Sequence, residues 1–120
     1  MEPRIFKIYT ALQWERRVSL GHLPWAPVDE ADGFVHLSAI QQVLETANKH
    51  FAGQQGLVLV EIDPAALPTG SLRWEVSRAG DRFPHVYASI PLEAALQHWG
   101  FPGSDTGFAL PAAFFSPSRR

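Results

Sequence analysis

The sequence of 120 residues contains no cysteine and is poor in charged residues. Without cysteine, the chain cannot form disulfides, zinc ribbons, thiol nucleophiles or cysteine-bound iron–sulfur clusters. Charged residues make up 18% of the chain and the net charge is −2, so no basic excess points to nucleic acid. No hydrophobic run has the length of a membrane span, and the first residues lack the apolar core of a signal peptide. We therefore expect a soluble, cytoplasmic protein.

The sequence does contain enough apolar residues for one folded domain. Hydrophobic residues make up 46% of the chain and aromatic residues 12%. A chain of this length usually forms a single domain, and we find no low-complexity segment that would divide it. We expect residues 1–120 to fold as one domain, with residues 116–120 as a frayed tail.

Alternating β-branched and aromatic residues predict strands at residues 4–10, 33–38, 71–77 and 83–90. A nearly continuous aliphatic run predicts a buried strand at residues 56–63. The turn signal RAGD lies between the strands at 71–77 and 83–90 and predicts a hairpin. Apolar residues at helical spacing predict helices at residues 11–20, 39–51 and 91–100. Thr10 with Gln13, and Ser38 with Gln41, have the spacing of capping boxes for the first two helices.

The connecting segments and the order of elements indicate the fold class. Residues 22–33 hold two prolines and an Asp-Gly pair, which predicts an irregular loop. Residues 101–120 are also expected to be irregular, with the apolar stretch 108–115 packing back on the body. The elements lack the regular strand–helix alternation of a doubly wound sheet. We predict an α+β domain with a curved, mainly antiparallel, split sheet and about three helices.

Two predicted strands carry the same arrangement of an aromatic residue, a histidine and a hydroxyl. In GFVHLS, alternation puts Phe34, His36 and Ser38 on one face. In FPHVYAS, it puts His85 and Tyr87 on one face. A histidine in such a run invites a functional interpretation, because its proton state changes near physiological pH.

The neighbouring predicted strand adds Arg73 and Glu75 on a common face. If the three faces converge, they form a cleft with two imidazoles, a phenol, a guanidinium, a carboxylate and aromatic walls. Such a mixture suits a polar aromatic ligand, because rings stack on rings and donors meet phosphates and hydroxyls.

Structural interpretations stand beside this one. Ser38 is well placed to cap the following helix, and His36 could be a core histidine bonded to a backbone carbonyl. Arg73 and Glu75 could form an exposed ion pair that contributes little to stability.

A metal site is a further alternative, with His36, His85 and a carboxylate from Glu75 or Asp81 as ligands. The sequence has no HxH or HExxH spacing that would support it. We therefore predict no metal ligands and no permanently bound cofactor.

Four stretches resemble a known family in order along the chain: IFKIYTALQWERR, ADGFVHLSAIQQVLETANKHFAG, LVLVEID and LRWEVSRAGDRFPHVYASIPLEAAL. The family is a small bacterial one of unknown function, called domain of unknown function nine-fifty-two. GFVHLS and FPHVY are its most specific signatures. By fold this family is grouped with ADP-ribosyltransferases and RNA 2′-phosphotransferases, so the resemblance implies a split sheet that holds NAD in a central cleft.

The resemblance also implies roles for individual residues. His36 and Ser38 fall in the second superfamily motif, and His85 and Tyr87 lie near the third, where transferases carry a catalytic glutamate. His36 would bind a ribose hydroxyl or phosphate, Tyr87 would stack on the base or nicotinamide, and Arg73 would offset phosphate charge.

The remaining motif positions depart from the superfamily pattern. Lys7, Tyr9 or Thr10 must replace the histidine of the first motif, and no glutamate is recognisable in the third. Glu75 could reach in from the neighbouring strand, so that either it or His85 would polarise the nucleophile.

Together these interpretations predict a protein whose partner is a small nucleotide-like ligand such as NAD or ADP-ribose. NAD would be a substrate, and the activity an ADP-ribosyl- or 2′-phosphotransferase reaction. An RNA end is a further possible ligand that the charge does not support. The alternatives are a non-catalytic ligand sensor and a metal-dependent hydrolase that uses His36 and His85.

Overall fold

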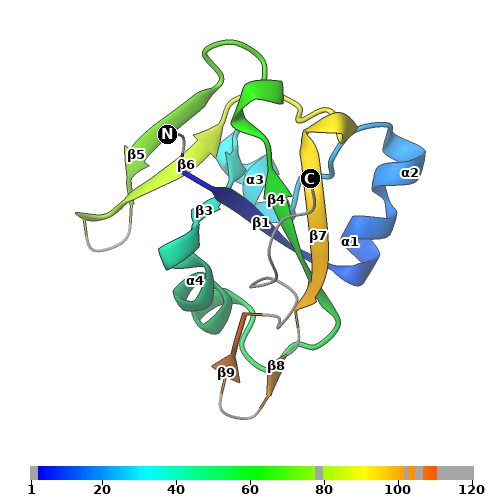
Figure 1. Ribbon diagram of the computed structural model, residues 1–120, viewed down its shortest axis with the longest axis vertical. Helices are drawn as coiled ribbons and strands as arrows, with labels where there is room; N and C mark the ends of the chain where they lie inside the picture. The colour runs from blue at the N-terminus through cyan, green and yellow to red at the C-terminus, as the bar shows by residue number, and fades with distance from the viewer. Residues whose placement is uncertain (1–2, 78–79, 102, 105–106, 111–120) are drawn as a thin grey trace, which may run out of the picture.

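The computed structural model describes residues 3–77, 80–101, 103–104 and 107–110. Two antiparallel sheets form its body (Figure 1). The larger one has the order β3-β1-β4-β7, and the smaller one has the order β2-β6-β5. A short β8-β9 ribbon lies beside α4. The α+β class and the split, antiparallel sheet predicted from the sequence are confirmed.

The helices and strands of the described chain have the following bounds: β1 Ile5–Thr10, α1 Ala11–Glu15, α2 Arg17–Leu20, α3 Pro27–Asp32, β2 Val35–His36, β3 Ser38–Ala39, α4 Val43–His50, β4 Leu57–Ile62, β5 Leu72–Val76, β6 Arg82–Val86, β7 Ala95–Phe101, β8 Gly103–Ser104 and β9 Gly107–Phe108. Three 3₁₀ turns lie between them: η1 Ile40–Gln42, η2 Pro64–Ala66 and η4 Leu92–Ala94.

The central strands of the larger sheet, β1 and β4, are buried on both faces. Along β1, Ile5 and Tyr9 belong to one apolar cluster, whereas Phe6 and Ile8 belong to a second cluster that includes α4. This alternation follows from the period of two residues in a strand. Lys7 has the same parity as Ile5 and Tyr9, which explains why its long side chain is only 5% exposed.

The strand predicted at residues 33–38 is divided between the two sheets. Val35 and His36 pair with β6 in the smaller sheet, whereas Ser38 and Ala39 pair with β1 in the larger one. Leu37 lies at the crossing, and its backbone N–H donates to the carbonyl of Pro84 at 3.0 Å. This crossing places the two sheets next to each other.

Two sequence predictions of secondary structure were wrong. Residues 91–100 do not form a helix, because after η4 the chain continues as β7 and pairs along β4. Sheet pairing of β4 therefore outweighs the local helical preference of LEAAL. The loop predicted at 22–33 contains α3, which begins with Pro27 at its first position and ends at Gly33 with a φ of 85°.

The cap predicted at Ser38 was also wrong. The side chain of Gln42, rather than Gln41, accepts a hydrogen bond from the backbone N–H of Ala39 at 2.9 Å. The cap at Thr10 was right, since its hydroxyl accepts from the N–H of Gln13 at 3.1 Å. The stretch 108–115, predicted to pack on the body, lies mostly outside the described residues, as does the tail 116–120.

Candidate functional site

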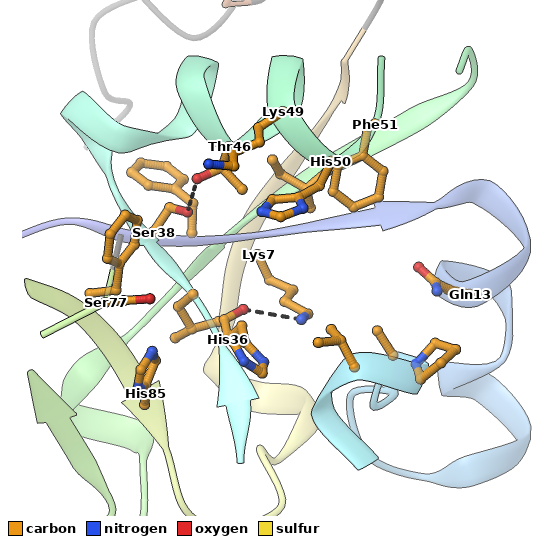
Figure 2. A pocket seen from close by; sticks show the side chains of 17 residues that line it. Lys7, Gln13, His36, Ser38, Thr46, Lys49, His50, Phe51, Ser77 and His85 are labelled. Carbon is orange, nitrogen blue, oxygen red and sulfur yellow. Dashed lines mark hydrogen bonds between the residues drawn. The ribbon is translucent and has the colours of Figure 1, made fainter. Parts of the chain in front are cut away.

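A cleft of about 530 Å³ opens beside β1, between the larger sheet and the smaller sheet. In the described chain, β3 pairs with β1 only at Ile5 and Phe6, so no strand covers the rest of that edge of β1. The cleft walls come from β1, β2, β3, β6, the start of α3 and the last turn of α4. In the view of Figure 2, Thr46 and His50 of α4 lie on one side of β1, and His36 and His85 lie on the other. The volume falls within the range of small-molecule sites.

The smaller sheet brings the two histidines together. His36 of β2 pairs directly with His85 of β6, and Arg73 of β5 pairs with His85 on its other side. The two imidazole centroids are 5.4 Å apart. The Phe34 ring lies against both, with centroids 4.5 Å from His36 and 4.2 Å from His85. Five of the predicted residues, Phe34, His36, Arg73, His85 and Tyr87, therefore share one face.

Glu75 links two of these side chains through a single oxygen. Nδ1 of His85 donates to Oε1 of Glu75 at 2.8 Å, and the Tyr87 hydroxyl donates to the same oxygen at 2.7 Å. These hydrogen bonds lower the pKa of Glu75 and raise that of Tyr87. The Arg73 guanidinium lies 5.1 Å from the centroid of the Tyr87 ring. Glu75 is therefore held as a carboxylate beside His85.

His85 retains one uncommitted nitrogen. Because Nδ1 donates its hydrogen to Glu75, the neutral ring has its lone pair on Nε2. Among the residues that the structure describes, Nε2 has no hydrogen-bond partner, although His85 is only 6% exposed and lines the cleft. In Figure 2 the ring projects from β6 with a nitrogen at its outer end. A buried, unsatisfied acceptor of this kind is uncommon in proteins and is often a site of function.

His36 is in the opposite condition, because both of its ring nitrogens are engaged. Nδ1 lies 2.7 Å from Oδ1 of Asp29, and Nε2 lies 2.9 Å from Oδ2 of Asp32. Its backbone N–H also donates to Asp29 at 3.0 Å. His36 thus lines the cleft with a ring whose orientation is fixed by two carboxylates.

Asp29 is a central residue that sequence reasoning missed. It is completely buried, and its carboxylate accepts from Nζ of Lys7 at 2.9 Å and from the N–H of Ala26 at 2.7 Å, besides its bonds to His36. Burial acts to raise the pKa of Asp29, but the hydrogen bonds from His36 and the charge of Lys7 outweigh it and hold that pKa below 3.8. An acidic residue two positions after a proline at a helix start was the signal available in the sequence.

The other predicted ligand-binding residues have partners within the protein. Lys7 lines the cleft, but its ammonium also donates to the carbonyl of His36 at 3.0 Å. Ser38 lines the cleft and donates to the hydroxyl of Thr46 at 3.2 Å. Thr10 caps α1 and is not among the residues that line the cleft.

Sequence reasoning also missed the wall that α4 contributes. Lys49 and His50 form its basic last turn, and Phe51 follows directly. Val28, near the start of α3, completes the mouth of the cleft. Only the tertiary structure shows that these residues line the same cleft as the two histidines.

The geometry does not favour the metal alternative. In the described part of the chain, no group of three or more histidine, aspartate or glutamate residues is placed to hold a metal ion. Both nitrogens of His36 already contact carboxylates, so His36 and His85 do not present two free lone pairs to a common point.

The fold and the site define a small α+β protein with a ligand-sized cleft between two antiparallel sheets. No helix in the described chain is long and apolar enough to cross a membrane. The chain belongs to the family described as protein of unknown function (DUF952), whose model matches residues 8–98.

Solved structures of one bacterial protein are similar to this chain. The crystal structure of protein CC0527 from Caulobacter crescentus is 37% identical, with a TM-score of 0.83 over 89% of this chain and 94% of that one. The solution NMR structure of CC0527 is 39% identical, with a TM-score of 0.73 over 88% and 90% of the two chains. The search of curated proteins gave no match.

Proposed function

We propose that the cleft binds a small nucleotide-like ligand such as NAD or ADP-ribose. The observation that carries this proposal is Nε2 of His85, an acceptor without a partner among the described residues, on a nearly buried side chain that lines a cleft of about 530 Å³. An acceptor nitrogen at the wall of a cleft can take a hydrogen bond from a bound ligand, and a ribose hydroxyl can supply the donor.

The rest of the cleft suits the other parts of such a ligand. Phe51, which is half-buried, provides an aromatic wall against which a base or nicotinamide ring can pack. Lys49, at the end of α4, provides positive charge for phosphate oxygens. Tyr87 and Arg73 lie on the same sheet face as His85 but are not among the residues that line the cleft, so their roles in stacking and phosphate binding stay predictions.

The resemblance to the ADP-ribosyltransferase group suggests a reaction as well as binding. An ADP-ribosyl- or 2′-phosphotransferase would use the His85–Glu75 pair near the reacting atoms, whereas a sensor would only bind. Turnover of fluorescent etheno-NAD separates these two forms of the proposal. With a sensor, product should form no faster than in buffer without protein.

Binding is tested by thermal shift with NAD, ADP-ribose and a 2′-phosphorylated nucleotide. A ligand that binds only the folded protein raises the melting temperature by mass action. We expect at least one of these compounds to stabilise the protein in proportion to the logarithm of its concentration. If none of them does so at millimolar concentration, the nucleotide assignment is wrong.

A matched pair of surface valines tests where the ligand binds. Val28 at the cleft mouth is 52% exposed, and Val18 on α2, outside the cleft, is 76% exposed. We expect Val28→Glu to lower the affinity for the nucleotide that gave a thermal shift about tenfold or more, because the new carboxylate adds a negative charge near the bound phosphates. Val18→Glu adds the same charge elsewhere and should leave the affinity unchanged. Equal affinities of the two variants in calorimetry would place the ligand outside the cleft.

A further inference from the structure

We propose that His85 is a general base, whose Nε2 takes the proton of a hydroxyl group on water or an alcohol bound in the cleft, and that Glu75 positions it. This inference rests on the proposed function only in taking the cleft as the ligand site. It adds the chemical class of the reacting group, a hydroxyl, and it chooses between the two residues that could polarise the nucleophile.

Only one of the two imidazoles has a lone pair available. Both ring nitrogens of His36 are directed at carboxylate oxygens of Asp29 and Asp32, so neither is open to a hydroxyl group in the cleft. His85 donates from Nδ1 to Glu75 and keeps the lone pair on Nε2. A general base must have such a lone pair within hydrogen-bond reach of the proton that it removes.

Glu75 performs two physical tasks in this arrangement. Its hydrogen bond selects the tautomer with the proton on Nδ1, which is the tautomer that leaves Nε2 basic. Its negative charge also stabilises the imidazolium that forms when Nε2 gains a proton. The Tyr87 hydroxyl donates to the same carboxylate oxygen and so fixes Glu75 in place.

The step balances without any further reactant. The bound hydroxyl gives its proton to Nε2 while an oxygen lone pair forms a bond to the electrophilic carbon or phosphorus of the ligand. The bond to the leaving group breaks, and its electron pair departs on that group. The imidazolium then passes its proton to the leaving group or to water, which restores the neutral ring.

The tautomer is measured first, by two-bond ¹⁵N–¹H NMR of the histidine rings in the full chain, with His85→Gln to assign the signals. We expect neutral His85 to carry its proton on Nδ1. In Glu75→Ala, at a partly exposed position, we expect the proton to move to Nε2, the nitrogen preferred by free histidine. Glu15→Ala, at an exposed site on α1, should change nothing. A proton on Nε2 in the wild-type protein would overturn the proposal.

The base is then tested with p-nitrophenyl acetate, an ester small enough for the cleft, with water as the hydroxyl. We expect His85→Ala to lower kcat/KM at least about tenfold, within the contribution of a positioned general base. Glu75→Ala should lower it less, and the wild-type reaction should be slower in D₂O. His98→Ala removes an exposed imidazole of β7 and should have no effect. Equal rates for wild-type protein and His85→Ala, or no solvent isotope effect, would contradict the assignment.

These outcomes are distinguishable from failure of the nucleotide proposal. The tautomer and ester measurements need no nucleotide, so they test His85 alone. A nucleotide-induced thermal shift with equal ester rates would leave a binding cleft without a general base. The reverse result would leave an active base whose substrate is not a nucleotide.

Discussion

At the scale of single residues, the most constrained group is the carboxylate of Asp29. It connects three elements, because its donors come from Lys7 on β1, Ala26 at the start of α3 and His36 on β2. A fully buried carboxylate is tolerated only when charges and hydrogen bonds satisfy it, as they do here. The same contacts fix the orientation of His36 at the cleft wall.

Asp29→Asn should therefore be costly. The variant leaves the ammonium of Lys7, which is 5% exposed, without a counter-charge. We expect a loss of about 3–5 kcal/mol in the free energy of unfolding, measured by urea denaturation. Asp32→Asn is the control, because this carboxylate is 47% exposed and its loss should cost less than about 1 kcal/mol. Similar losses in both variants would show that the buried pair of Asp29 and Lys7 contributes no more to the free energy of unfolding than the exposed Asp32.

Much of the candidate cluster could be predicted from strand alternation alone. Phe34, His36, His85, Tyr87 and Glu75 meet because β2, β6 and β5 pair in one sheet, as the period of two residues requires. Asp29 could not be found this way. It lies in a segment that the sequence predicted to be a loop. Its partner Lys7 is 22 positions away in the chain, so only tertiary packing reveals the contact.

At the scale of elements, local signals worked where the partner was also local. The capping box of α1 joins Thr10 and Gln13, which are neighbours in the sequence, and it was predicted correctly. The helix predicted at 91–100 failed because its alternative, pairing with β4, depends on residues more than thirty positions away. Local propensity is a weak guide when a neighbouring strand would otherwise remain unpaired.

Two adjacent glutamines provide a test at this scale. Gln42 is buried, accepts from the N–H of Ala39 at 2.9 Å and donates to the carbonyl of Arg82 on β6 at 2.8 Å. We expect Gln42→Ala to cost about 2 kcal/mol in the free energy of unfolding, because both backbone groups lose their partner. Gln41→Ala, at an exposed position, should change it by less than about 0.5 kcal/mol. Chemical denaturation of both variants decides the matter, and a larger effect at Gln41 would show that the predicted cap was right after all.

At the scale of the whole molecule, the cleft is a consequence of the divided sheet. The chain leaves the smaller sheet at His36 and enters the larger one at Ser38, so the two sheets share this segment but no continuous ladder. In the part of the chain that the structure describes, the edge of β1 beyond Phe6 is not paired with a strand, and this edge and the helices α3 and α4 enclose the opening. A single closed sheet would have filled this space with a strand.

The larger sheet also has an ion pair between the nearly buried carboxylate of Glu61 and the partly exposed Arg4. Glu61 on β4 accepts two bonds from Arg4, at 2.8 and 2.9 Å, and one from Gln97 on β7 at 2.9 Å. Burial acts to raise the pKa of Glu61, but the hydrogen bonds from Arg4 and Gln97 outweigh it and lower that pKa below 4.5. Asp29 has its pKa lowered in the same direction.

Stability should therefore fall in acid in a way to which these two carboxylates contribute. A carboxyl group with a lowered pKa in the folded state binds fewer protons than in the unfolded chain, so its contribution is complete above the unfolded pKa and is lost as the pH falls through the folded one. For Glu61 and Asp29 the unfolded values are 4.5 and 3.8, and the loss should begin below about pH 4.5. We expect Glu61→Gln to flatten part of this decline in urea titrations at successive pH values, whereas Glu15→Gln should follow the wild-type curve. If Glu61→Gln retains the full slope, the pair with Arg4 does not couple folding to protons, and other groups must account for the acid response.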